Sequence, residues 1–338
     1  MSAELTSEST EHSARDLLAS HNQKKEAPFM TMSTRDPQGS MAKAIAILAR
    51  QGLPSADADS LPESPKRFED GHRWRLEIPS VEGPAAMRAV LEEAASRGIL
   101  VDRVSQGSGI FMLSEVEISA MLDQGRESGT EVCLFVGPRA SWDVGRQVTS
   151  SSGAVSGPTL RGADQVRFAL EDVRYACERG LRSVLVGDIG LLGIIGRAKR
   201  EGDLPEDLVI KTSVALPCSN PATARVLEDL GATSINLATD LSLGQIGAIR
   251  QAIDVPVDIY CEAPDDFGGA VRHYEVVDMV RVAAPLYIKF TVRNAPGIYP
   301  AGAHLENTVL STARERVRRA SLAIDLLKRY APEEQQEG

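Results

Sequence analysis

The chain has 338 residues, a net charge of -10 and a hydrophobic fraction of 43%. An acidic surface repels phosphate backbones, so nucleic acid is not an expected partner. No apolar run reaches the roughly 18 residues of a transmembrane helix, and residues 1–25 lack the apolar stretch of a signal peptide. We therefore expect a cytoplasmic protein that binds neither nucleic acid nor membranes.

The N-terminal part of the chain differs in composition from the rest. Residues 1–40 are polar with little periodicity and are expected to form a disordered or loosely docked tail. Residues 41–51 have a helix pattern that Gly52 and Pro54 end. Residues 54–70, rich in Pro, Ser and Asp, are expected to be a linker or a wrap over the base of the next domain. The predicted domains are thus a helix and linker at 41–71, a main domain at 72–332 and a flexible tail at 333–338.

From Arg73 onward, short apolar runs alternate with helix patterns. Strands are predicted at 73–79, 100–106, 131–137, 183–188, 208–214, 234–240, 256–262 and 286–292. Helices are predicted at 84–97, 114–128, 163–179, 191–201, 221–230, 243–253, 273–283 and 312–330. This order predicts an α/β fold, a single (β/α)8 TIM barrel with an N-terminal extension. The glycine-rich stretch 187–193 fits no phosphate-loop motif and is interpreted as close helix–strand packing.

Alternate residues of a barrel strand face the helices, and the others fill the interior. On the predicted strands this alternation turns a polar set inward, namely Arg75, Glu77, Asp188, Lys211, Asn236, Asp258, Glu262, Lys289 and Arg293. Barrel interiors are usually filled by Val, Ile and Leu, and a buried charge is costly unless it is paired. The set is therefore either a neutralising lattice of ion pairs or a functional site. Arg75 and Asp258 begin their strands and are expected to form a structural pair near the base.

Inward lysines opposite acids suit carbon-acid chemistry. Lys289 is the first candidate, with Lys211 beside it, either to form a Schiff base with a carbonyl substrate or to stabilise an enolate as an ammonium. Glu262 and Asp188 end their strands at the face where barrel sites are built, so they are the candidate acid/base residues.

A divalent metal is the alternative to a lysine mechanism. Glu77, Asp188 and Glu262 are hard oxygen ligands that favour Mg²⁺ or Mn²⁺. The five histidines form no HxH or HExxH pattern, so a histidine metal site is not expected. The four cysteines stand singly in apolar segments and are expected to be reduced core residues.

The loops after the strands supply candidates for substrate binding. Arg139 follows the third strand and Arg293 ends the eighth. Either can hold a carboxylate or phosphate through two hydrogen bonds, or can instead pair with Asp143, Asp265 or Asp266. Asn236, Asp266 and His304 complete the predicted set. The long Gly- and Ser-rich loop that runs from the third strand to residue 162 has the composition of a mobile lid.

A motif pattern between residues 208 and 250 points to a known family. It consists of a strand followed by Asn220, Ala222, Leu227, Leu230-Gly231, Asp240-Leu241-Ser242-Leu243 and Gln245-Ile246. This pattern resembles the peptidase U32, or collagenase-like, family. In that family the next strand leads into a His/Gly loop and cysteines, some of which hold iron–sulfur clusters in the tRNA- and quinone-hydroxylating members. Here Cys261 stands alone in that segment, so a divergent U32-like barrel without a cluster is expected, and the reaction stays open.

Three functions are open at this point. The leading one is a lyase or isomerase that acts on a small polar carbonyl or carboxylate substrate with lysine or divalent-metal assistance. The second is a U32-like peptidase, hydrolase or metal-assisted enzyme that acts on a larger substrate. The third is a non-catalytic ligand-binding barrel in which the inward charges pair fully among themselves. The acidic, helix-coated exterior also permits a homodimer.

Overall fold

The computed structural model of the chain describes residues 41–137 and 159–332. The two predicted tails, most of the predicted lid and Arg139 lie outside the described residues. The chain divides into two units at Ile45, and the fold below is that of the second unit.

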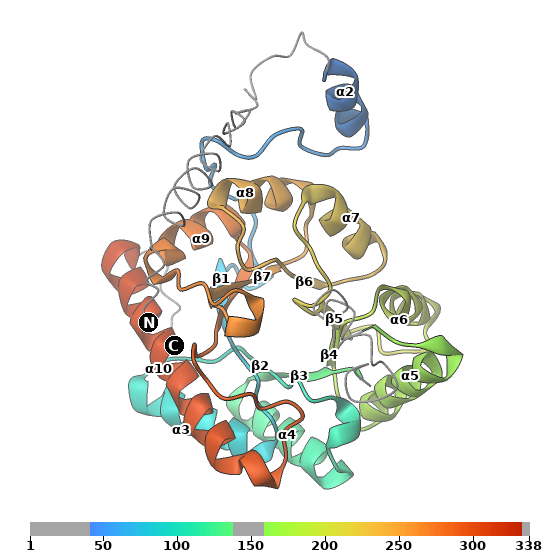
Figure 1. Cartoon of the computed structure of the whole chain (residues 1–338), viewed down its shortest axis with the longest axis vertical. Helices are drawn as coiled ribbons and strands as arrows, with labels where there is room; N and C mark the ends of the chain where they lie inside the picture. Colours follow the sequence, from blue (N-terminus) through green and yellow to red (C-terminus); the bar gives the residue numbers. More distant parts are fainter. Residues whose placement is uncertain (1–40, 138–158, 333–338) are drawn as a thin grey trace, which may run out of the picture. The chain divides into compact units, whose positions relative to one another are not determined.

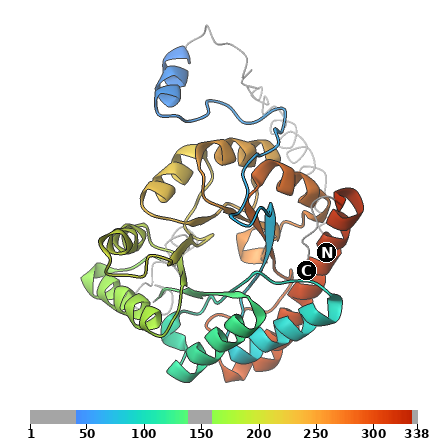
Figure 2. The ribbon, with the colours of Figure 1, turned by 180° about the vertical axis from the view of Figure 1, so that it is seen from behind.

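The second unit is built on a closed barrel of parallel strands, each paired with the next along the chain and the last paired with the first. The helices encircle the strands in the view along the barrel (Figure 1), and the opposite view shows the same ring (Figure 2). The predicted (β/α)8 barrel is therefore confirmed. The strands are β1 Trp74–Pro79, β2 Arg103–Ser105, β3 Glu131–Phe135, β4 Ser183–Val186, β5 Val209–Thr212, β6 Ser234–Asn236, β7 Val257–Glu262 and β8 Leu286–Phe290.

The helices agree with the expected ranges to within three residues at each end, except that α10 begins at Glu306, six residues before its predicted start. They are α2 Ala42–Arg50, α3 Pro84–Arg97, α4 Glu115–Ser128, α5 Gly162–Glu178, α6 Ile189–Glu201, α7 Pro221–Asp229, α8 Leu243–Ala252, α9 Val276–Ala283 and α10 Glu306–Tyr330. Short 3-10 turns lie at η1 Ile110–Met112, η5 Asp265–Phe267, η6 His273–Glu275 and η7 Ala303–Leu305. Local signals explain several of the ends, since Ser114 and Glu117 form a capping box at α4 and left-handed Gly98 ends α3.

The segment before β1 runs over the outside of the barrel. The Ala58 amide donates to Gly244 O of α8, and the Ser64 amide donates to Arg281 O of α9 at 2.8 Å. Phe68 then packs edge-on against Tyr287 of β8, with 5.3 Å between the ring centroids. Tyr287 lies near the start of its strand, so this segment reaches the base of the barrel.

Candidate functional site

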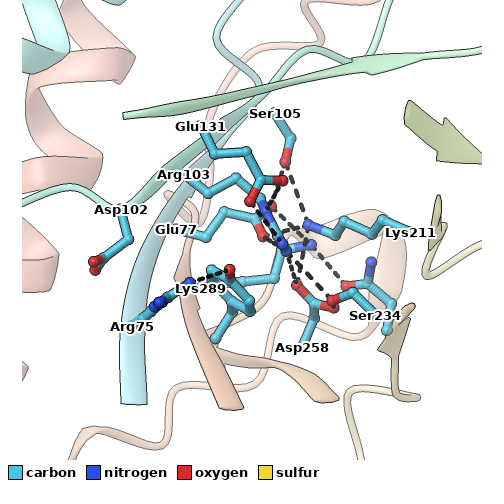
Figure 3. A network of polar contacts seen from close by, with 12 residues as sticks. Arg75, Glu77, Asp102, Arg103, Ser105, Glu131, Lys211, Ser234, Asp258 and Lys289 are labelled. Carbon is cyan, nitrogen blue, oxygen red and sulfur yellow. Dashed lines mark hydrogen bonds and ion pairs between the residues drawn. The ribbon is translucent and has the colours of Figure 1, made fainter. Parts of the chain in front are cut away.

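The interior of the barrel is centred on Glu77 of β1, which is completely buried. Its carboxylate accepts hydrogen bonds from the Lys211 ammonium and the Ser105 hydroxyl. Lys211 Nζ also lies 3.1 Å from Asp258 Oδ1. Figure 3 shows these side chains converging from different strands. Glu77, Lys211 and Asp258, all expected inward, therefore meet inside the barrel.

The network also contains Arg103 of β2, which the sequence reasoning missed. Its Nη1 donates to Asp258 Oδ1 at 3.1 Å, and its Nε donates to Glu131 Oε1 at 2.7 Å. The guanidinium stacks 3.5 Å from the centroid of the Tyr287 ring. The sequence could have indicated Arg103, because the next residue, Val104, is apolar and alternation then turns Arg103 inward. In the structure Val104 is indeed buried in the main core beneath the helices.

Asp258, which was expected to pair with Arg75, pairs with Arg103 instead. Arg75 instead pairs with Asp70 at 2.6 Å and donates to the Tyr287 hydroxyl at 3.3 Å. The predicted Arg75–Asp258 pair is wrong, because Tyr287 is aligned with Arg75 on one side and with Asp258 on the other and so stands between them.

The network opens to solvent at the base of the barrel. Glu131, its lowest member, has a side chain that is 26% exposed. A cavity of about 300 Å³ there is lined by Asp70, His72, Arg75, Leu100, Asp102, Gly129 and Glu131. The N-terminal face of a barrel generally serves stability, so we interpret this end as structural.

The charges of the network balance. Three acids face three cations, namely Glu77, Glu131 and Asp258 against Arg103, Lys211 and Lys289. Burial disfavours the charged form of Glu77, but Lys211, Lys289 and Arg103 outweigh burial and hold the pKa of Glu77 well below its ordinary value. Burial raises the pKa of Asp258, and the neighbouring Glu77 acts in the same direction.

Lys289 forms the edge of the network nearest the C-terminal ends of the strands. Its Nζ donates to Asn236 Oδ1 at 2.7 Å and lies 3.5 Å from Glu77 Oε1. The ammonium also lies 4.3 Å from the centroid of the Tyr260 ring, a cation–π contact. The Asn236 amide is oriented in turn by donating to Thr212 O at 2.5 Å. Lys289 and Asn236, both predicted site residues, are thus brought together.

The interior has an apolar side as well. Cys133 and Phe135 of β3 and Leu185 of β4 form a small cluster separate from the main core. Their strand neighbours Leu134 and Val184 belong to the main core beneath the helices. The alternation therefore places the small cluster inside the barrel, where it gives the interior one polar and one apolar wall.

Glu262 does not join the interior network. A β-bulge at Tyr260/Glu262 places Glu262 opposite Phe290 of β8. The additional residue reverses the alternation of the strand, so the inward orientation expected for Glu262 is wrong. Its buried carboxylate instead lies 3.3 Å from His273 Nε2 of η6 and 3.4 Å from Arg319 Nη1 of α10.

Asp188 caps a helix. Its Oδ1 accepts from the Leu191 amide at 2.8 Å, and its Oδ2 accepts from the Leu160 amide at 3.0 Å. The bond from Leu191 caps the start of α6, which is the ordinary role of an N-cap aspartate, and the bond from Leu160 ties the segment before α5 to the same carboxylate. The structure does not bring Asp188 to Lys289 or to Glu77.

The other predicted substrate-binding residues lie on exposed loops. Arg293 is exposed and pairs with Asp265 at 3.1 Å, rather than turning into the barrel as expected. Asp266 of η5 and His304 of η7 are exposed as well. None of the three contacts Lys289 in the described part of the chain.

The structure does not assemble the predicted metal triad. Glu77 pairs with lysines, Asp188 caps α6 and Glu262 contacts His273. Within residues 41–137 and 159–332 no group of three or more His, Cys, Asp or Glu side chains is arranged to hold a metal ion.

None of the helices in these two ranges combines the length and the apolar character that a membrane span requires. The four cysteines are free and buried, as expected.

The sequence profile of peptidase family U32 matches residues 159–262. The expected resemblance to the U32 family is confirmed. The matched segment runs from before α5 to the end of β7, so it contains Lys211, Asn236 and Asp258 but neither Glu77 nor Lys289. No curated protein sequence matches the chain.

Solved structures with a similar fold include a U32 peptidase, which is 17% identical with a TM-score of 0.39 over 69% of this chain and 98% of its own. Thiamine phosphate pyrophosphorylase from Pyrococcus furiosus is 11% identical with a TM-score of 0.42, over 75% of this chain and 96% of its own. 3-Keto-L-gulonate-6-phosphate decarboxylase from Vibrio cholerae is 15% identical with a TM-score of 0.39, over 73% of this chain and 98% of its own. At these identities and TM-scores the likeness carries no argument about function, which must be argued from the site.

Proposed function

We propose that the chain is a barrel enzyme that binds the carbonyl oxygen of a small polar substrate at Lys289 and carries out lyase- or isomerase-type carbon-acid chemistry. The observation that supports this most is the Lys289 ammonium, held between Asn236, Glu77 and the Tyr260 ring at the upper edge of the network. A cation fixed in a buried site stabilises an enolate without reorganisation during the reaction.

The surroundings of Lys289 favour the electrostatic role over a Schiff base. The neighbours of its Nζ are an amide oxygen, a carboxylate oxygen and an aromatic face, and all three bind a cation. Lys211 is enclosed by Glu77, Asp258 and Ser105, so we assign it to support of the network. Glu262 and Asp188 receive no catalytic role in this proposal, because both carboxylates contact other groups.

Deuterium exchange tests the proposal across a range of carbonyl compounds. Proton NMR in D₂O follows the loss of the protons next to the carbonyl in a panel of 2-oxo acids and hydroxyketones. We expect the wild-type protein to exchange at least one compound and Lys289→Met to slow that exchange by about 100-fold or more, the scale for loss of an oxyanion donor. Lys328→Met, a change of the same kind on an exposed residue, should exchange at the wild-type rate.

Two results would count against Lys289. One is unchanged exchange in Lys289→Met, and the other is the absence of exchange with the whole panel. Borohydride treatment during turnover separates the two lysine chemistries, since only a Schiff base gives a stable adduct detectable by mass. The electrostatic role predicts no adduct.

The match to peptidase family U32 favours a second candidate, hydrolysis of a peptide bond. Lys289 would then polarise the peptide carbonyl. Cleavage of a mixed peptide library, lost in Lys289→Met and kept in Lys328→Met, would support this candidate, and deuterium exchange without cleavage would support the first.

A further inference from the structure

A second buried cation, Arg316 of α10, lies near the C-terminal ends of the strands. It is 4% exposed, and its Nη1 donates to the carbonyl oxygen of Ser80 at 3.2 Å. Ser80 directly follows β1 at that end of the barrel. The guanidinium thus lies at the face where barrel enzymes build their sites.

Among the described residues, Arg316 lacks the acidic partner that a buried arginine normally has. Its Nε is buried without a hydrogen bond, and the guanidinium forms no ion pair with any residue of 41–137 or 159–332. Arg318 and Arg319 on the same helix differ, because both pair with Glu315. A buried cation without an acid is costly, and an anionic ligand is one way to compensate it.

Burial lowers the pKa of Arg316, and among carboxylates that of Glu82 opposes this shift through its negative charge. Its two carboxylate oxygens accept hydrogen bonds from the Gly107 amide at 2.6 Å and the Ser108 amide at 3.0 Å. Both carboxylate oxygens of Glu82 are therefore engaged by the loop after β2.

The surroundings of Arg316 form a fixed frame. Ser80 has a φ of 62°, a left-handed conformation that is strained for a residue other than glycine, and its hydroxyl is bonded to the Tyr299 hydroxyl. The Tyr299 ring lies so close to Gly107 that a Cβ there would come within 2.5 Å of it. Tyr299 and Tyr260 both lie within electrostatic range of Arg316. Lys289 is aligned with Glu77 on β1, three residues before Ser80, so the two cations lie beside the same part of that strand.

We propose that Arg316 binds the carboxylate or phosphate group of the substrate whose carbonyl oxygen is bound by Lys289. This assignment rests on the proposed function and narrows its substrate class to small oxo compounds that carry an oxyanion group. The planar guanidinium suits such a group, because it can donate two parallel hydrogen bonds to it. Arg316 thus takes the role of binding the substrate's oxyanion group, which the sequence suggested for Arg139 and Arg293.

Calorimetric titration of the full chain with inorganic phosphate and, in a separate arm, with acetate tests the site and distinguishes the two groups. We expect at least one of these anions to bind wild-type protein and Arg316→Gln to weaken that binding by about tenfold or more. Arg314→Gln is the matched control, because Arg314 lies on the same helix, is exposed and loses the same charge. It should bind within about twofold of wild type, as surface changes away from a site usually do.

Equal affinity of Arg316→Gln and Arg314→Gln for the anion would overturn the proposal. A wild-type protein that binds neither anion at concentrations up to about 10 mM, which is above the Kd of even weak specific complexes, would overturn it too. If Arg316→Gln does not fold by circular dichroism, Arg316→Lys replaces it. The lysine keeps the charge but loses the two-donor geometry, so binding should still weaken by about fivefold. Lys289→Met should bind the anion as wild type does, so a failure of the proposed chemistry and a failure of this site give different results.

Discussion

Glu77 decides the character of the barrel interior at the scale of single residues. Lys211, Lys289 and Arg103 reach it from three other strands, and Nζ of Lys289 and Nη1 of Arg103 each lie 3.5 Å from its oxygens. Without Glu77, three cations would face the two remaining acids. A buried charge that loses its partner is far more costly than the pair itself is favourable.

Glu77→Gln should therefore lower the free energy of unfolding by about 3 kcal/mol or more. Urea denaturation at pH 7 measures this loss. Glu127→Gln makes the same change on an exposed residue and should stay within about 0.5 kcal/mol of wild type. Similar stability of the two variants would mean that the network contributes little.

At the scale of elements, packing against the end of α7 requires glycine at one position of α6 and not at another. A Cβ on Gly196 would lie 2.1 Å from the backbone oxygen of Leu230, which follows α7, whereas a Cβ on Gly193 would meet only a Leu230 methyl at 3.5 Å. The sequence predicted close packing for the stretch 187–193, but the tightest approach falls one turn later, at Gly196. The partner segment decides which glycine is required.

Alanine substitutions on α6 test this difference. Gly193→Ala should be neutral or stabilising by up to about 1 kcal/mol, because alanine favours a helix interior. Gly196→Ala should destabilise by about 2 kcal/mol or more, since the backbone oxygen of Leu230 cannot yield as a side chain can. Thermal unfolding of the two variants measures both effects, and equal melting temperatures would refute the packing argument.

Strand β7 shows a limit of pattern reading at the same scale. Alternation correctly placed Asp258 inside, but the bulge before Glu262 turned that side chain toward η6 and α10. A bulge leaves no signature in a run such as VDIYCE, because it depends on pairing with β8. The fold and most inward residues could thus be predicted from the sequence, whereas the outward orientation of Glu262 could not.

For the whole molecule, the network links the stability of the barrel to pH. The folded-state pKa of Glu77 lies well below the unfolded value of 4.5. The stabilisation is therefore complete above about pH 4.5 and is lost as the pH falls from there toward the folded-state pKa, because only the unfolded state binds the proton in that range.

The difference in stability between wild type and Glu77→Gln should accordingly be constant near neutral pH and narrow below about pH 4.5. Urea denaturation of both proteins at pH 7, 5.5, 4.5 and 3.5 measures this trend. If the difference in unfolding free energy between the two proteins were the same at pH 3.5 as at pH 7, the neighbouring cations would not lower the pKa of Glu77 in the folded state.

The sequence by itself determined the barrel, the boundaries of most elements and the presence of Glu77, Lys211, Asp258 and Lys289 in its interior, because hydrophobic periodicity along the chain carries that information. Only the tertiary structure decided which charges meet. Ion pairs between distant strands depend on register, on intervening rings such as that of Tyr287 and on the bulge in β7. The same holds for Arg316, which a helix pattern cannot distinguish from its paired neighbours until α10 is packed against β1 and β8.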